Sequence, residues 1–221
     1  TMTRKLGLIH TSATLVPVFQ ELTDKYLAGK DIEVFNISDD SLIKSTIERG
    51  ALTSDTSRRV VNYVASAEEA GADFILVTCS SIGPAVETAA TLVEVPVLRV
   101  DQPMADKAVQ MGSKIGVVAT LSTTLEPTSD WVRRRAILAG KEIELTSRLC
   151  EGAFDALMSG KPEVHDQSVA SALKELSQQV DVILLAQASM ARVVNQLSDE
   201  DKKVPILTSP ELAVQHLADI L

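Results

Sequence analysis

The feature that most constrains this 221-residue chain is an internal repeat. The segment KLGLIHTSAT, which begins at Lys5, is matched by KIGVVATLST, which begins at Lys114, 109 positions later. Two further segments, ADFILVTCSS and EVPVLRVDQPM, are matched by VDVILLAQAS and KVPILTSPELA at offsets of 108 and 109. Any two buried parallel strands look alike, but three matched pairs make that explanation weak: Gly7 with Gly116, Asp73 with Asp181, and Pro96 with Pro205. The chain is therefore interpreted as a duplicated unit of roughly 100 residues.

Short apolar runs alternate with helical stretches inside the repeat. Periodicity predicts one helical apolar face through Val18, Leu22 and Leu27. The β–α–β–α order predicts an α/β fold in which each unit has a parallel sheet flanked by helices. In the first unit we expect strands at Lys5–His10, Asp31–Ile37, Asp73–Thr78 and Val95–Val100, and helices at Val16–Gly29, Ser54–Gly71 and Ile82–Leu92.

Composition excludes several classes of partner. The net charge is −9 and aromatic residues make up 3% of the chain, which argues against nucleic acid or an anionic membrane as a partner. No apolar run reaches the length of about 18 residues that a membrane helix needs, and the first residues lack the apolar run of an export signal. We therefore expect a cytoplasmic protein. Two cysteines and three scattered histidines predict no metal site.

Small hydroxyl residues gather where four of the expected strands end. Ligands of such sheets bind at the carboxyl ends of the strands, and hydroxyls with helix N-terminal N–H groups suit a carboxylate. For a single serine or threonine, helix capping is the simpler interpretation. The recurrence in four clusters favours a binding site for a small carboxylate. Its candidate residues are Thr11, Ser12, Ser80, Ser81, Thr120, Thr123, Thr124 and Ser189.

Cys79 is the sharpest catalytic candidate. It follows the apolar run FILVT and precedes a predicted helix, whose N-terminus is expected to lower the thiol pKa. A thiolate there could remove or return a proton, or attack covalently. The alternative is a small buried apolar residue.

The histidines and the second cysteine are weaker candidates. His10 ends the first strand and either orients or protonates a substrate group, or only bonds to backbone. Cys150 follows a predicted strand at 142–147 and is a lesser candidate for a second thiol. His165 and His216 are expected at the surface, with Asp166 as a helix cap.

The duplication and the cysteine in VTCSS resemble the superfamily of aspartate, glutamate and hydantoin racemases, which also contains maleate isomerases and arylmalonate decarboxylases. The resemblance covers essentially the whole chain. It implies two pseudo-symmetric flavodoxin-like (Rossmann-like) domains with the active site in the cleft between them. It also implies that the C-terminal segment returns to the first domain, so that the domains are 1–100 plus about 208–221, and 101–207. A homo-oligomer is implied as well.

Racemases of this superfamily use two cysteines, one from each half. The first matches Cys79, and the second falls 108 positions later, at Gln187. An amide is neither a base nor an acid near neutral pH. The symmetric two-thiol mechanism is therefore not expected, and Gln187 is assigned to substrate binding.

The leading expectation is a cofactor-independent, racemase-like isomerase that acts on a small carboxylate, with Cys79 and His10 as catalytic residues. Gln187 keeps open a decarboxylase or cis-trans isomerase that uses one cysteine. A third alternative, of another class, is a protein that binds a small carboxylate without catalysis.

Overall fold

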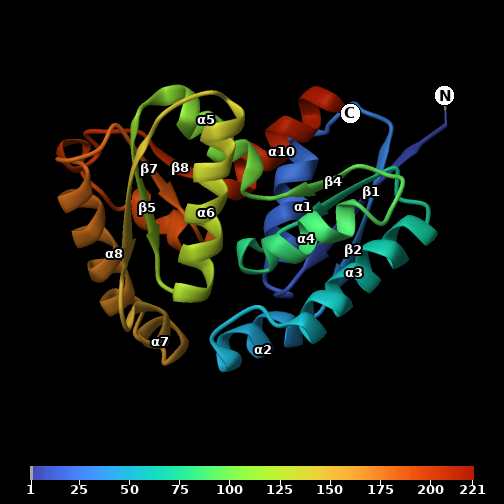
Figure 1. Ribbon diagram of the computed structural model, residues 1–221, viewed down its shortest axis with the longest axis horizontal. Helices are drawn as coiled ribbons and strands as arrows, with labels where there is room; N and C mark the ends of the chain where they lie inside the picture. Colours follow the sequence, from blue (N-terminus) through green and yellow to red (C-terminus); the bar gives the residue numbers. More distant parts are fainter. Residues whose placement is uncertain (1) are drawn as a thin grey trace. The chain divides into compact units, whose positions relative to one another are not determined.

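The computed structural model describes residues 2–221, which divide into two compact units. The first unit comprises the chain as far as Val100 together with Pro210–Leu221, and the second comprises Asp101–Ser209 (Figure 1). Each unit is built on one four-stranded sheet. All pairings within both sheets are parallel, so each unit is an α/β structure as predicted.

The first sheet has the strand order β2-β1-β3-β4. Because side chains of a strand alternate between faces, Leu6 and Leu8 pack on one side and Ile9 on the other. Helices α1 and α10 cover the first side, and α2, α3 and α4 cover the second. The strands are β1 (Arg4–His10), β2 (Ile32–Ser38), β3 (Phe74–Val77) and β4 (Val97–Arg99). The helices are α1 (Leu15–Tyr26), α2 (Ser41–Arg49), α3 (Ser54–Glu69), the 3-10 turn η1 (Ser80–Ile82), α4 (Gly83–Ala90) and α10 (Ser209–Ile220).

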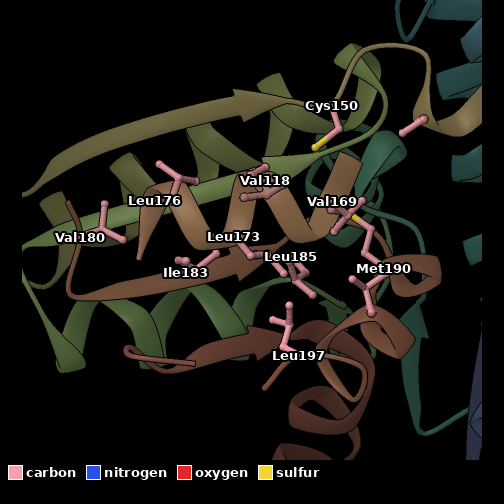
Figure 2. Close-up of a cluster of buried hydrophobic side chains, with 13 residues drawn as sticks. Val118, Cys150, Val169, Leu173, Leu176, Val180, Ile183, Leu185, Met190 and Leu197 are labelled. Carbon is pink, nitrogen blue, oxygen red and sulfur yellow. The ribbon is translucent and has the colours of Figure 1, made fainter. Parts of the chain in front are cut away.

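The second sheet has the equivalent order β6-β5-β7-β8. Val118, Ile183 and Leu185 from its strands pack against Leu173 and Leu176 of α8 in one buried cluster (Figure 2). Helices α5 and α6 contact each other and the same sheet. The strands are β5 (Lys114–Ala119), β6 (Glu144–Leu149), β7 (Val182–Leu185) and β8 (Ile206–Thr208). The helical elements are α5 (Gln102–Met111), α6 (Ser122–Leu138), α7 (Ala153–Met158), α8 (Pro162–Leu176), η2 (Ala188–Met190), α9 (Ala191–Val194) and η3 (Asp199–Asp201).

The matched residues of the sequence repeat have matched structural roles. The Asp73 carboxylate accepts a hydrogen bond from the backbone N–H of Lys5 at 2.7 Å, and Asp181 accepts one from Lys114 at 2.9 Å. Each aspartate thereby joins the start of one central strand to the turn before its neighbour. In the same way, the Pro96 and Pro205 carbonyls each accept the first ladder bond from the neighbouring strand. The duplication is therefore structural.

The predicted apolar face of the first helix was wrong at one position. Val18 is 41% exposed, whereas Leu22 and Leu27 pack in the core as predicted, and the buried residues of α1 itself are Phe19 and Thr23. Thr23 can be buried because its hydroxyl donates to the Phe19 carbonyl one turn earlier, at 2.9 Å. Helix α2 was not predicted, since its sequence SLIKSTIER is mostly polar and its apolar face is narrow.

No helix within residues 2–221 is both long and apolar enough to cross a membrane.

Candidate functional site

Cys79 lies directly after β3, at the carboxyl end of the first sheet. Its backbone is extended and leads into η1, which continues into α4. The Thr11 side chain, from the loop after β1, and the backbone N–H groups of Ser81 and Ile82 are hydrogen-bond partners of the sulfur, and the Ser81 side chain contributes as well. These donors reach the sulfur because neighbouring parallel strands end at the same edge of the sheet. The structure thus brings together three predicted site residues, Thr11, Cys79 and Ser81.

The expected direction of the Cys79 pKa was wrong. Burial raises the pKa of this thiol, and the hydrogen bonds from Thr11, Ser81 and Ile82 oppose the rise only in part. Desolvation disfavours the thiolate more than the few N–H groups of the turn favour it. Cys79 at neutral pH is therefore a thiol, which can donate a proton and which becomes a base only after losing it.

His10 is fully buried at the end of β1. Its Nε2 lies 2.8 Å from Asn36 Oδ1 and its Nδ1 lies 2.7 Å from the Thr78 hydroxyl. Burial lowers the pKa of the imidazole, although the bond to Asn36 opposes this shift. A neutral ring fits both partners, since Nε2–H donates to the amide oxygen and Nδ1 accepts from Thr78. His10 therefore holds the residue that immediately precedes Cys79.

Two further predicted residues of the first unit lie beside this loop. Ser80 is buried in η1. Ser12 is half-buried in the loop after β1, where its hydroxyl lies 2.7 Å from that of Thr14. Both therefore lie at the same edge of the sheet as Cys79.

Arg99 is a residue whose connection to this loop the sequence did not reveal. It is 3% exposed, it pairs with Val77 in the β3–β4 ladder, and its guanidinium contacts Glu87 at 2.8 Å. A Cβ on Gly83 would come within 2.3 Å of the Arg99 guanidinium carbon, so only a glycine permits this contact. Arg99 thus supports the turn that follows Cys79.

Gln187 lies at the equivalent edge of the second sheet, between β7 and η2. Its Oε1 accepts hydrogen bonds from the backbone N–H groups of Thr120 at 2.6 Å and Leu121 at 3.2 Å. Its Nε2 donates to the Thr120 hydroxyl at 2.8 Å. These bonds fix the orientation of the amide, because two N–H donors point at the same atom.

The other predicted residues of the second unit are less closely grouped. Thr123 and Thr124 lie in the first turn of α6, and the Thr123 hydroxyl is buried without a hydrogen-bond partner among the described residues. Ser189 is exposed in η2. Thr120 and Gln187, both predicted site residues, are hydrogen-bonded to each other.

Cys150 points into the core from the end of β6 (Figure 2). It is 5% exposed, and its sulfur lies 3.8 Å from the Ser168 carbonyl. Burial raises the pKa of this thiol too. These features are typical of a packed, un-ionised cysteine.

His165 was predicted at the surface, and that prediction was wrong. The side chain is fully buried on the inner face of α8, one turn before Val169. Its Nδ1 lies 2.8 Å from Asp166 Oδ1, and Asp166 in turn binds Arg192. Asp166 lies inside α8, whose N-cap position is Lys161, so the prediction of a helix cap was wrong as well and the carboxylate instead pairs with the imidazole. The hydropathy pattern gave little sign of this burial, because the residues that directly follow His165 in α8 are polar. Within residues 2–221, no group of three histidine, cysteine or acidic residues could hold a metal ion.

Fold and site together define a class: a duplicated α/β protein with a hydrogen-bonded thiol at one strand edge and an amide at the equivalent edge. The model of the Asp/Glu/Hydantoin racemase family matches residues 4–217, so the chain belongs to this family. Membership supports a racemase-like enzyme of the isomerase class. No curated protein matches the chain significantly.

Solved racemase structures share this fold. A glutamate racemase from Bacillus anthracis is 18% identical with a TM-score of 0.72, over 99% of this chain and 81% of that one. The glutamate racemase from Thermus thermophilus, solved with β-chloro-D-alanine, is 18% identical with a TM-score of 0.73, over 99% and 80%. An allantoin racemase from Klebsiella pneumoniae is 16% identical with a TM-score of 0.67, over 98% and 87%. At these identities the likeness shows the fold alone.

Proposed function

We propose that this protein is a cofactor-independent racemase or epimerase that moves the proton on the carbon next to a small carboxylate, with Cys79 as a proton-transfer residue. The observation that supports this most directly is the surrounding of the Cys79 sulfur. A thiol that only fills space needs no N–H donors, whereas a thiol that ionises during turnover is stabilised by those of Ser81 and Ile82.

The carboxylate of the substrate is held by donors at the strand ends. Thr11, Ser12, Ser80 and Ser81 lie at the edge that carries Cys79. Thr120, Thr123, Thr124 and Ser189 are the proposed donors of the second unit. Preorganised donors of this kind stabilise the enediolate that forms when the proton leaves. His10 keeps the strand end in place through Thr78, and we propose it as a positioning residue.

Gln187 supports an alternative within the same family. The second unit has an amide where the first has the Cys79 thiol, and the amide oxygen accepts the N–H groups of Thr120 and Leu121. A decarboxylase or a cis-trans isomerase needs one thiol, to protonate a carbanion or to add to a double bond. The same substitution also favours a third candidate, a protein that binds a carboxylate without turning it over.

Proton NMR in D₂O distinguishes these functions. The panel contains both enantiomers of aspartate and glutamate, a hydantoin, maleate and an arylmalonate. We expect α-deuteration with inversion of one enantiomeric pair, reduced about 100-fold or more in Cys79→Ser. Cys150→Ser is the matched control, because its thiol is packed in the core.

Each other outcome has a defined meaning. Inversion at the wild-type rate in Cys79→Ser would contradict the role of the thiol. A deuterated decarboxylation product, or fumarate formed from maleate, would establish the alternative with one cysteine. Melting shifts with a carboxylate but no exchange of any compound would favour the binding protein.

A further inference from the structure

Asp39 lies directly after β2, at the edge of the first sheet that also carries Cys79. Its backbone N–H donates to the His10 carbonyl at 3.0 Å. His10 is followed by Thr11, whose side chain is a hydrogen-bond partner of the Cys79 sulfur. The backbone of Asp39 is therefore one hydrogen bond and one residue away from a group that binds the thiol.

The Asp39 carboxylate is saturated with hydrogen bonds. Its Oδ1 accepts from the Ser41 N–H at 2.9 Å and from the Ser41 hydroxyl at 2.5 Å. Its Oδ2 accepts from Nη2 of Arg59 and from the Tyr63 hydroxyl. A carboxylate offers about four lone-pair positions, so these four donors leave none for a substrate. The carboxylate therefore acts on the groups around it.

These bonds join three elements of the first unit. Ser41 begins α2, whereas Arg59 and Tyr63 lie one turn apart on α3. Burial would raise the pKa of the Asp39 carboxyl, but the Ser41 and Tyr63 hydrogen bonds and the nearby guanidinium lower it overall. An ionised carboxylate thus ties two helices to the end of a strand at neutral pH.

Helix α2 reaches the turn after Cys79 through the core. Leu42, the residue after Ser41, is fully buried and shares one cluster with Ile82 of η1. The Cys79 side chain packs against the same cluster. The position of α2, which Asp39 helps to set, therefore affects the turn whose N–H groups reach the sulfur.

The ion pair of Asp39 contributes orientation more than stability. The Arg59 side chain is 42% exposed, and exposed ion pairs contribute little to folding. The donors come from two different helices, so together they fix the direction of the carboxylate and of the backbone that carries it. A network of this kind is suited to positioning.

We propose that Asp39 is a positioning residue for the thiol: its carboxylate fixes the end of β2 and thereby holds Thr11 within hydrogen-bond reach of the Cys79 sulfur. This inference rests on the proposed role of Cys79 in proton transfer. It involves residues of the first unit alone. Asp39 acts through Thr11 and does not touch the substrate.

A displaced Thr11 should leave the thiolate less stabilised. Burial raises the pKa of Cys79, and the Thr11 hydrogen bond lowers it in part. Without this bond the thiol loses its proton only at higher pH. Variants of Asp39 should therefore shift the ionisation of a residue that they do not touch.

The pH profile of iodoacetamide labelling tests this without a substrate. All variants carry Cys150→Ser, so that labelling reports Cys79 alone. The midpoint of the profile reports the thiol pKa, because the thiolate is the nucleophile, whereas the plateau at high pH reports access to the sulfur. Asp39→Asn keeps the shape of the side chain but removes the charge that holds Arg59. We expect its midpoint to lie above that of the parent protein.

Two further variants serve as controls. Asp40→Asn removes the same charge from the next position, where the carboxylate is exposed and pairs with Lys44, and its midpoint should equal that of the parent protein. Tyr63→Phe removes one donor to Asp39 and leaves the charge in place. It should shift the midpoint in the same direction as Asp39→Asn but by less, and it replaces that variant if the latter does not fold.

A double-variant cycle shows whether Asp39 acts through Thr11. Thr11→Val keeps the shape and removes the hydroxyl, so it should reduce the thiolate population at neutral pH by about 10-fold. If the two residues act in one chain of contacts, Asp39→Asn adds little to the shift that Thr11→Val causes. Full additivity of the two shifts, or an unshifted midpoint in Asp39→Asn, would overturn the proposal.

Turnover gives a second readout and separates this inference from the proposed function. With a compound that the wild type racemises, Asp39→Asn should lower kcat by about 10- to 100-fold and leave KM nearly unchanged. A change in KM alone would overturn the positioning role, since it would place Asp39 in substrate binding. Wild-type protein that exchanges no compound would count against the proposed function, while the labelling profiles would still decide the role of Asp39.

Discussion

The Arg99 guanidinium packs directly against Gly83, so closely that a Cβ added to Gly83 would lie 2.3 Å from the guanidinium carbon. Gly83 begins α4, four residues after Cys79, and Arg99 is held by Glu87 one turn further along the same helix. The contact therefore couples the end of β4 to the turn whose N–H groups reach the thiol.

Replacing Gly83 with alanine should disturb this turn. Arg99 is buried and ion-paired, so it cannot move away cheaply, and overpacking of this kind costs about 1–3 kcal/mol. Urea unfolding measures the loss of stability, and the pH profile of iodoacetamide labelling measures the change at Cys79. Thr88→Ala, at an exposed position of the same helix, is the control. An unchanged labelling profile in Gly83→Ala would show that the turn does not depend on the contact.

Cys79 should make the protein less stable at alkaline pH. Burial raises the pKa of its thiol, so the folded chain retains the proton where the unfolded chain has lost it. This contribution to stability is complete below the unfolded thiol pKa of about 8.5 and disappears as the pH rises through the folded-state value. The unfolding free energy of the wild type should therefore fall more steeply above that pH than that of Cys79→Ser. Parallel curves for the two proteins would contradict the raised pKa.

Gln187 should stabilise the loop after β5. Gln187→Leu leaves the N–H groups of Thr120 and Leu121 without their acceptor, at a cost of about 1–3 kcal/mol. Gln187→Glu keeps an acceptor oxygen and should lose less. Chemical unfolding of both variants, with the exposed Ser189→Ala as control, compares the costs. Equal stability of Gln187→Leu and the wild type would mean that water replaces the amide.

Leu217 should tie the C-terminal helix to the first unit. It is fully buried in a cluster with Leu6, Phe19 and Leu76, although it lies at the far end of the chain. Leu217→Ala should cost about 2–5 kcal/mol through the lost contacts and the cavity. Ile220→Ala, at a position 47% exposed, should change the unfolding free energy by less than about 0.5 kcal/mol. Similar effects for the two variants would contradict the packing of α10.

Much of the fold could be predicted from short-range patterns. The repeat predicted that the second unit is a copy of the first, and the structure agrees, because Asp73 and Pro96 have partners in Asp181 and Pro205 that make the same backbone contacts. Helix α2 and the buried residues of α1 were not predicted, because polar residues such as Thr23 satisfy their hydrogen bonds inside the helix. A hydropathy pattern scores such a side chain as exposed, although its hydrogen bond allows it to be buried.

The sequence by itself determined the duplicated α/β units, the family, and the equivalent positions of Cys79 and Gln187 in the two copies of the repeat. These properties depend on local patterns and spacing. Only the tertiary structure decided the ionisation of Cys79, the engagement of both His10 nitrogens and the burial of His165 against Asp166. Those properties arise from desolvation and from contacts between residues distant in the chain. Both depend on which residues surround a group in space, and a short stretch of sequence does not contain that information.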